Sequence, residues 1–189
     1  MKSKLKICID PGHGMSNRKR GVYDCGAAVK MQGKEITEAE IVMDWANELR
    51  GILQGMGHEV VRTRVDARDP APVSRRDDIA LSYGCDRMIS LHCNAAAGTA
   101  RGTEVYYRGA DDKAMAERLS AAVCGVLGIP NRGAKMEEQS QHSALAVLEF
   151  DKCWLVELGF IDNAGDRAAL LDETKMLLAC QALADVITA

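Results

Sequence analysis

A strand is predicted for Leu5-Lys6-Ile7-Cys8-Ile9-Asp10, and Pro11-Gly12-His13-Gly14 follows it directly. A second apolar strand ends in Ser90-Leu91-His92-Cys93-Asn94. His13 and His92 therefore both stand where a strand ends. In open α/β sheets, the crevice beyond the carboxyl ends of the strands collects side chains that are distant in sequence. We expect the two histidines to meet there, in a position to share one metal ion.

Strand and helix patterns alternate along the rest of the chain. The predicted strands are 5–10, 59–64, 87–93, 102–107, 145–148 and 154–157, and the predicted helices are 37–54, 74–83, 111–127 and 166–187. This order indicates the α/β class, with a mainly parallel or mixed sheet of about six strands and helices on both faces. The length of 189 residues fits one domain over residues 1–189.

Two segments, 15–33 and 131–143, carry no strand or helix pattern and are predicted to be loops. Loops of this length near strand ends more often belong to binding sites than to the scaffold, although plain flexible connections are the alternative. His142 lies in the second loop, where it could approach a substrate. His58 stands at a predicted helix-to-strand turn, and we expect it to face solvent.

The composition is that of a soluble globular protein, with 47% hydrophobic and 27% charged residues. A net charge of −3 gives no reason to expect nucleic acid or an anionic membrane as partner. No apolar run approaches the roughly 20 residues of a membrane span, so no membrane insertion is expected. Lys2, Lys4 and Lys6 imitate the start of a signal peptide, but Asp10 interrupts the short apolar stretch that follows.

The seven cysteines form an odd set without a CxxC pair. This pattern argues against a zinc knuckle and against a complete disulfide framework. Most are expected to be small apolar core residues. Cys93 is a neighbour of His92, but alternation along a strand sends the two side chains to opposite faces, so we do not expect Cys93 to be a ligand.

The helix predicted from Thr37 has a well-defined start. Thr37 and Glu40 form a capping-box pattern, and an apolar stripe follows from Ile41. Glu38 precedes this stripe by three residues, which places its carboxylate on the inward face. An inward carboxylate needs an arginine, backbone donors or a metal as partner, because leaving it unpaired costs several kcal/mol. The alternative is a first-turn glutamate that is favoured by the helix dipole.

A second acid interrupts the apolar segment Trp154-Leu155-Val156-Glu157-Leu158-Gly159-Phe160. A buried strand has no structural use for Glu157, although satisfied core glutamates do occur. If this strand is parallel to the others, the acid emerges into the same crevice as His13 and His92.

Two histidines and one carboxylate are the ligand set of catalytic zinc sites, which keep a fourth position for water. A zinc ion would bring the pKa of that water to about 7 and polarise a substrate carbonyl. Glu157 is then the candidate that takes the proton of the water and returns it to a leaving nitrogen. The natural reaction class is amide hydrolysis with one Zn²⁺ ion.

Seven segments of the chain share their pattern and order with one known family. They are Asp10-Pro11-Gly12-His13-Gly14, Asp24-Cys25-Gly26-Ala27, the helix with Glu38, Val61-Arg62-Thr63-Arg64, Ser90-Leu91-His92-Cys93-Asn94, Gly102-Thr103-Glu104-Val105-Tyr106-Tyr107 and Leu155-Val156-Glu157-Leu158-Gly159-Phe160-Ile161-Asp162-Asn163. In this order they resemble the zinc-dependent N-acetylmuramoyl-L-alanine amidases of the type-3 amidase family. The chain departs from the pattern in a longer link at 15–23 and in Cys25, which stands where the family has a proline.

The resemblance implies that His13, Glu38 and His92 bind the zinc and that Glu157 is the catalytic acid/base. It implies as substrate the peptidoglycan amide between the lactyl group of N-acetylmuramic acid and L-alanine. Asn94, Arg64 and Glu104 are candidates for supporting or substrate contacts, although Arg64 could equally be a surface charge at a strand end.

Two other functions remain open: a zinc peptidase that cuts within peptides, and a non-catalytic wall-binding module on the same fold. The expected partners are peptidoglycan or muropeptides, with a monomeric protein and no nucleic acid. The chain fits a phage endolysin that is made in the cytoplasm and reaches the wall after release. It also fits the catalytic part of an exported autolysin or spore-cortex enzyme whose signal has been removed.

Overall fold

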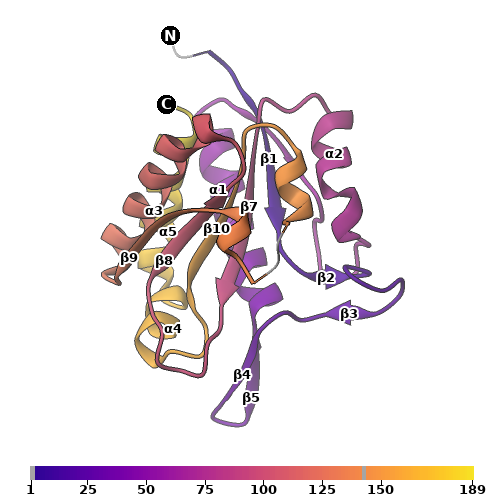
Figure 1. Cartoon of the computed structure of the whole chain (residues 1–189). Coiled ribbons are helices and arrows are strands. Elements are labelled where there is room, and N and C mark those ends of the chain that lie inside the picture. The colour runs from indigo at the N-terminus through magenta and orange to yellow at the C-terminus, as the bar shows by residue number, and fades with distance from the viewer. Residues whose placement is uncertain (1–2, 142–143) are drawn as a thin grey trace.

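The computed structural model describes residues 3–141 and 144–189. At its centre lies a six-stranded mixed sheet in the order β6-β1-β7-β10-β8-β9 (Figure 1). The strands are β1 (Lys6–Pro11), β6 (Glu59–Arg62), β7 (Arg87–Asn94), β8 (Thr103–Tyr107), β9 (Asn131–Met136) and β10 (Cys153–Phe160). Strands β6, β1, β7 and β10 are parallel, and β8 and β9 run the opposite way. The predicted α/β class with about six strands is confirmed.

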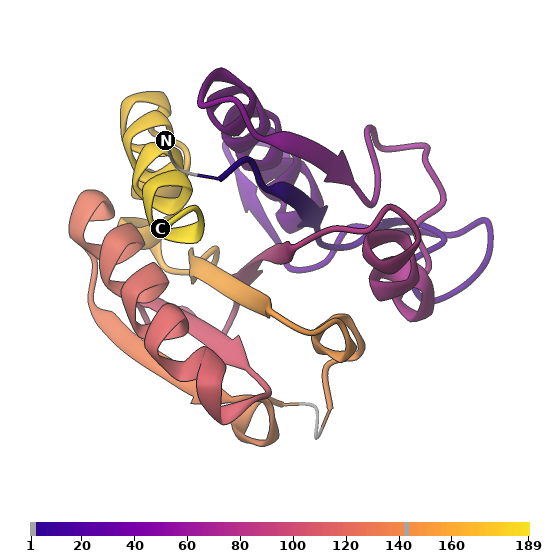
Figure 2. The same ribbon diagram turned by 90° about the horizontal axis from the view of Figure 1, so that it is seen from above.

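Helices cover both faces of this sheet. The long helices α1 (Glu38–Gly55), α5 (Glu173–Ile187) and α3 (Lys113–Leu127) form a layer on one face, as seen from above in Figure 2. Helix α2 (Arg76–Ser82) and the 3-10 turn η4 (Ala146–Glu149) pack on the other face. Helix α4 (Ala164–Leu170) connects β10 to α5. None of the helices in the described ranges combines the length and the apolar composition that a membrane span requires.

The remaining elements are short and lie in the connections. Two small hairpins follow β1: β2 (Gly14–Met15) pairs with β3 (Tyr23–Asp24), and β4 (Ala28–Met31) pairs with β5 (Lys34–Thr37). Single 3-10 turns occur as η1 (Val73–Arg75), η2 (Ala110–Asp112) and η3 (Glu137–Gln139). The hairpins bring the segment between β1 and α1 back towards the carboxyl end of β1 (Figure 1).

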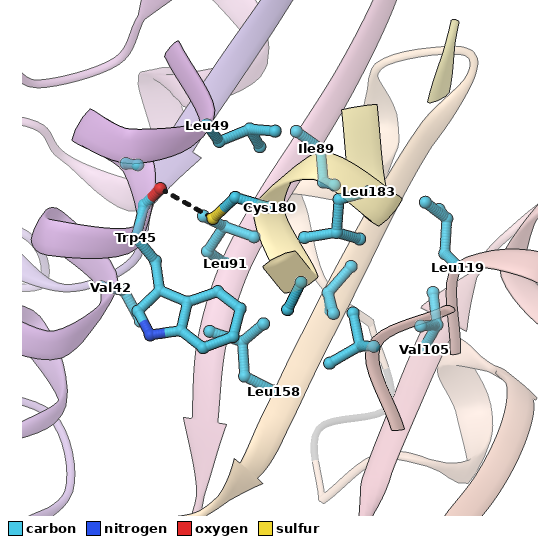
Figure 3. Close-up of a cluster of buried hydrophobic side chains, with 14 of the residues drawn as sticks. Val42, Trp45, Leu49, Ile89, Leu91, Val105, Leu119, Leu158, Cys180 and Leu183 are labelled. Atoms are coloured by element: carbon cyan, nitrogen blue, oxygen red, sulfur yellow. Dashed lines mark hydrogen bonds between the residues drawn. The ribbon is translucent and has the colours of Figure 1, made fainter. Parts of the chain in front are cut away.

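Strand alternation divides the core into two clusters of buried side chains, one on each face of the sheet. On the side of α1, α3 and α5, Trp45 packs among leucines and valines (Figure 3). Its indole nitrogen donates to the carbonyl of Leu170 at 3.2 Å. Cys180 lies in the same layer, where its thiol is 3.5 Å from the carbonyl of Trp45. The second cluster is smaller and includes Met88, Leu155 and Tyr106. All seven cysteines are free, as expected.

Four sequence predictions of secondary structure were wrong. Residues 15–33 were predicted as a loop, but they contain β3, β4 and the end of β2, which belong to the two small hairpins. Residues 145–148 were predicted as a strand, but η4 is a 3-10 turn whose Val147 and Leu148 fill the second cluster. So short an apolar run does not distinguish the two structures. Residues 131–143 were predicted as a loop, but β9 extends the edge of the sheet with a polar sequence. The predicted closing helix is two helices, because the Asp172 side chain accepts from Lys175 N and starts α5 anew.

His58 corrects another expectation. Its side chain is buried rather than exposed to solvent. The ring nitrogen Nδ1 accepts a hydrogen bond of 3.1 Å from the backbone of Leu5, just before β1. His58 therefore ties the turn before β6 to the start of the central strand.

A buried ion pair fixes the carboxyl end of β1. Asp10 lies 2.5 Å from Arg76 of α2, and both side chains are almost fully buried. Ser90 and Thr63 donate to the same carboxylate at 2.6 and 2.5 Å. Burial alone would raise the pKa of Asp10, but Arg76 and the two hydroxyl groups outweigh it and lower that pKa.

Removing one partner of this pair should destabilise the protein strongly. We expect Arg76→Met to lower the free energy of unfolding by about 3–5 kcal/mol, because the Asp10 carboxylate would stay buried without its cation. Arg75→Met is the matched control: Arg75 is largely exposed and, within the described part of the chain, pairs only with exposed Asp78, so its loss should change stability by less than about 1 kcal/mol. Urea denaturation of the three proteins measures the difference. Equal midpoints for the two variants would contradict the role given to Arg76.

Candidate metal centre and active site

The topology makes a crevice at the carboxyl ends of β1 and β7. After β1 the chain crosses through α1 to β6 on one side, and from β6 it crosses through α2 to β7 on the other side. Such a switch in direction leaves an open space beyond the strand ends. His13 follows β1 by two residues, and His92 lies near the end of β7. The centroids of the two imidazole rings are 5.0 Å apart, and the rings meet edge to face.

Glu38 joins the two histidines. Its Oε1 lies 3.0 Å from Nε2 of His13 and 3.0 Å from Nδ1 of His92. One ligand atom from each of these three residues lies within 4.8 Å of the others. The structure thus brings together the three residues that were expected to bind a metal.

The start of α1 aims Glu38 at this point. The Thr37 hydroxyl accepts from the backbone of Glu40 and donates to its carboxylate, so the predicted cap is formed. Glu38 is buried, and its oxygens accept from the backbone of Ala27 and Cys93, both at 2.9 Å. Although burial opposes its charge, contacts with His13 and His92 outweigh that effect and hold the pKa of Glu38 well below its usual range.

Cys93 takes the position that strand alternation predicts. Its side chain is buried in the cluster under α1, on the face opposite to His92. It contributes only its backbone amide to the site, through Glu38.

Buried arginines hold the backbone between β1 and His13. His13 has a left-handed φ of 60°, and the carbonyls before and at this residue are held by buried arginines. Arg64 donates to the carbonyls of Pro11 and Gly12 at 2.9 and 2.8 Å, and Arg76 donates to that of His13 at 2.6 Å. Arg64 is therefore a buried side chain that binds the backbone after β1, and not a surface charge.

Two glycines are required because they leave space for the cluster. A Cβ on Gly12 would lie 2.3 Å from Cε1 of His92. A Cβ on Gly26 would lie 2.5 Å from Oε2 of Glu38 and 2.7 Å from Cδ2 of His13. The chain thus keeps a cradle open around the three side chains.

These residues fit a divalent metal ion. Ligand atoms about 2.0–2.1 Å from a tetrahedrally coordinated ion are about 3.3 Å apart. The 3.0 Å separations of Glu38 Oε1 from the two imidazole nitrogens come close to that spacing. Behind His13, the carboxylate of Asp24 lies 3.2 Å from the other ring nitrogen. The charge of this carboxylate favours the orientation in which His13 turns Nε2 towards the cluster, while Nδ1 has no hydrogen bond of ordinary geometry among the described residues.

Glu157 lies beside this cluster. It pairs in register with His92 across the parallel strands β10 and β7, so the two side chains emerge on the same face of the sheet. Its Oε2 is buried and has no hydrogen-bond partner among the described residues. Burial raises the pKa of Glu157 well above its usual value, and the carboxylates of Glu38 and Glu104 raise it further.

The same row continues to Glu104, which pairs in register with Glu157 on β8. Glu104 is buried, and its Oε1 accepts from Asn94 at 2.9 Å and from Tyr106 at 2.8 Å. Asn94 therefore donates to Glu104. None of its hydrogen bonds within the described residues reaches His13, Glu38 or His92. The cluster, Glu157 and Glu104 all line one cavity of about 520 Å³.

Sequence reasoning missed two contributors to this site. Asp24 belongs to one of the segments that carry the family resemblance, but no role was predicted for it. Its acidic side chain, which can pair with a histidine such as His13, was the available signal. Arg76 gave no signal, because an arginine at the start of a helix is usually solvated. His142, which was expected near the substrate, lies outside the described residues.

Comparison with known proteins agrees with this geometry. A profile of the N-acetylmuramoyl-L-alanine amidase family matches residues 7–189. The chain belongs to this family. The resemblance noted in the sequence is thereby confirmed over nearly the whole chain.

Individual relatives support the same assignment. The chain is 30% identical over 183 residues to a Staphylococcus aureus protein named "Probable cell wall amidase LytH", covering 95% of this chain and 56% of that protein. The chain therefore spans little more than half the length of that relative. The catalytic domain of CwlV, an N-acetylmuramoyl-L-alanine amidase from Bacillus (Paenibacillus) polymyxa var. colistinus, matches with a TM-score of 0.82 and 27% identity, over 97% and 96% of the two chains. The amidase AmiC2 of Nostoc punctiforme matches with a TM-score of 0.80 and 25% identity, over 99% and 97%.

A methyl group in the cradle should disrupt metal binding. We expect Gly26→Ala to lower the affinity for a divalent metal ion at least tenfold, because its Cβ would displace Glu38 and His13. Gly21→Ala is the matched control: Gly21 also has a positive φ, 73° against 67°, but nothing lies within 4 Å of its added Cβ. Both variants should lose about 1 kcal/mol of stability from backbone strain alone. Competition titration with a metal indicator measures the metal affinity of both variants. Equal affinities would contradict the claim that a Cβ at position 26 displaces the metal ligands.

Proposed function

We propose that the chain is a zinc-dependent amidase that hydrolyses the amide between N-acetylmuramic acid and L-alanine in peptidoglycan. The observation that carries the proposal is the position of Glu157, in register with His92 beside a cluster of two imidazoles and one carboxylate. Membership in the N-acetylmuramoyl-L-alanine amidase family supports the choice of bond.

His13, Glu38 and His92 would hold a single Zn²⁺ ion. Two nitrogen ligands and one oxygen ligand suit zinc, and three protein ligands are typical of catalytic rather than structural zinc sites. When bound, the ion supplies Lewis acidity, which acidifies a coordinated water and polarises the scissile carbonyl. Asp24 would keep the ring of His13 in the orientation that presents Nε2.

Glu157 would move the proton. Burial and the neighbouring carboxylates raise its pKa, so its carboxylate is a stronger base than that of an ordinary glutamate and can take up a proton from the attacking water. Its unpartnered oxygen can then return this proton to the leaving nitrogen of the amide. A positioned carboxyl group of this kind contributes about 10²–10⁴ to the rate.

The cavity suits a wall fragment of peptide and sugar. It is open along the row from the metal cluster to Glu104, and it is lined by both polar and apolar residues. The Staphylococcus aureus relative is named a cell wall amidase, and we propose that this chain likewise acts on the cell wall. Peptidoglycan or its soluble muropeptides would be the substrate.

One alternative function is disfavoured by a particular observation, and the other is distinguished by experiment. A non-catalytic wall-binding module has no need for an unpaired buried carboxyl group such as that of Glu157. A zinc peptidase would use the same cluster, and only the bond that is cut distinguishes it from the amidase.

Substitutions should separate metal binding from proton transfer. We expect Glu157→Gln to retain one zinc ion per chain but to lower kcat by about 10²–10⁴, because the amide cannot take up the proton. His92→Ala should lose both zinc and activity, since two ligands remain in place of three. Zinc content by elemental analysis and turnover on the same samples give the answer. Full activity in the Glu157 variant would exclude it as the acid/base.

The products of digestion identify the bond. We expect purified peptidoglycan to release peptides with new L-alanine amino termini while its glycan strands stay intact. A chelator should stop the reaction, and added Zn²⁺ should restore it. Mass spectrometry that finds cuts between amino acids, with the lactyl amide preserved, would favour the peptidase instead.

A further inference from the structure

Two cations stand beside Glu104 in the cavity of the proposed active site. The Nε of Arg132 and the Nζ of Lys135 both donate to Oε2 of Glu104, the latter at 2.5 Å. The other oxygen of Glu104 already accepts from Asn94 and Tyr106. Glu104 is buried, whereas the side chains of Arg132 and Lys135 are 35% and 25% exposed. The carboxylate is therefore saturated, and the cations face the cavity.

Both cations have more donors than the protein uses. A guanidinium group carries five N–H donors and an ammonium group three. Within residues 3–141 and 144–189, Arg132 donates only through Nε, and Lys135 donates only to Glu104. Both terminal nitrogens of Arg132 are thus available in the fork that matches a carboxylate.

The positions of these groups are fixed before any ligand binds. The guanidinium of Arg132 lies over the ring of Phe160, 5.1 Å from its centroid. The ammonium of Lys135 lies 6.0 Å from the centroid of the Tyr106 ring. Each cation is thus held by one acid and one aromatic ring, which lowers the entropy lost on binding.

The distance to the reacting bond suits a short peptide. Glu104 is opposite Glu157 on the neighbouring strand, and β9 is the next strand beyond. The head groups of both cations reach back to the carboxylate of Glu104, which is one strand spacing, about 5 Å, from Glu157. An extended peptide covers about 3.3–3.6 Å per residue. A ligand whose amide lies at Glu157 would therefore place its second residue near Arg132 and Lys135.

We propose that Arg132 and Lys135, positioned by Glu104, form a subsite that binds a carboxylate of the substrate peptide one or two residues beyond the scissile amide. This inference rests on the proposed amidase function and adds a preference to it. Peptides with a free carboxylate at that position are preferred, and peptides in which it is a carboxamide are poorer substrates.

The test compares two muramoyl-L-alanyl peptides that differ only at the second residue, which carries a free carboxylate in one and a carboxamide in the other. We expect the zinc-loaded wild-type protein to show a roughly ten- to hundredfold higher kcat/KM for the carboxylate peptide. Most of the difference should lie in KM, because the contact exists both before and during the reaction.

Variants assign this preference to the two cations. Arg132→Gln and Lys135→Gln should each remove most of the preference, measured as the ratio of kcat/KM for the two peptides, because the carboxylate loses one of its cations. Arg132→Lys should keep part of it, because the charge remains and the fork is lost. Arg118→Gln is the matched control, since Arg118 is exposed on α3 and does not line the cavity, and it should keep the full preference.

Different failures have different meanings. Equal cleavage of both peptides by the wild type, or an unchanged preference in both glutamine variants, would overturn the subsite and leave the amidase function intact. Cleavage of neither peptide would contradict the amidase function. Calorimetric binding of the same two uncleaved peptides then decides on the subsite by itself, and equal dissociation constants would overturn it.

Discussion

The end of β1 depends on the pairing of Asp10 with Arg76. This ion pair is buried, and burying two charges costs several kcal/mol, so its value lies less in net stability than in the position that it fixes. Beyond β1, the amide of Gly12 still donates to the carbonyl of Leu91 on β7, but the carbonyl of Gly12 is bound by a side chain in place of a strand. Arg76 and Arg64 bind the carbonyls of Pro11, Gly12 and His13. A histidine with a left-handed backbone can then be held in one orientation.

The sheet distributes the remaining chemistry along one row. His92, Glu157 and Glu104 are register neighbours on β7, β10 and β8, so the period of two puts all three side chains on one face. The opposite face at the same level is apolar and packs on the long helices. The chain needs no special loop to bring these groups together, because strand pairing alone does so. Only His13 and Glu38 depend on segments outside the sheet.

The features that were predicted correctly from the sequence are those that local patterns determine. The cap at Thr37, the inward position of Glu38 and the alternation that separates Cys93 from His92 are all properties of a few adjacent residues. The edge strand β9 was missed because its polar sequence has no apolar periodicity, and its place is set by pairing with β8. The burial of His58, Arg64 and Arg76 was missed for a related reason. Their partners come from distant segments and are backbone groups together with, for Arg76, the carboxylate of Asp10, which no local pattern reveals.

Three glutamates share the cavity, and their surroundings give them different properties. Glu38 contacts two imidazoles and Glu104 contacts two cations, so the pKa of each is lowered despite burial. Glu157 lies between them with no such partner. Burial and the two neighbouring charges therefore raise its pKa. When the pKa values of neighbouring acids are shifted in opposite directions, one acid stays charged and the other can carry a proton. The negative charges of Glu38 and Glu104 thus favour the protonated form of Glu157, and the positive charge of Lys135 partly offsets their effect on its pKa.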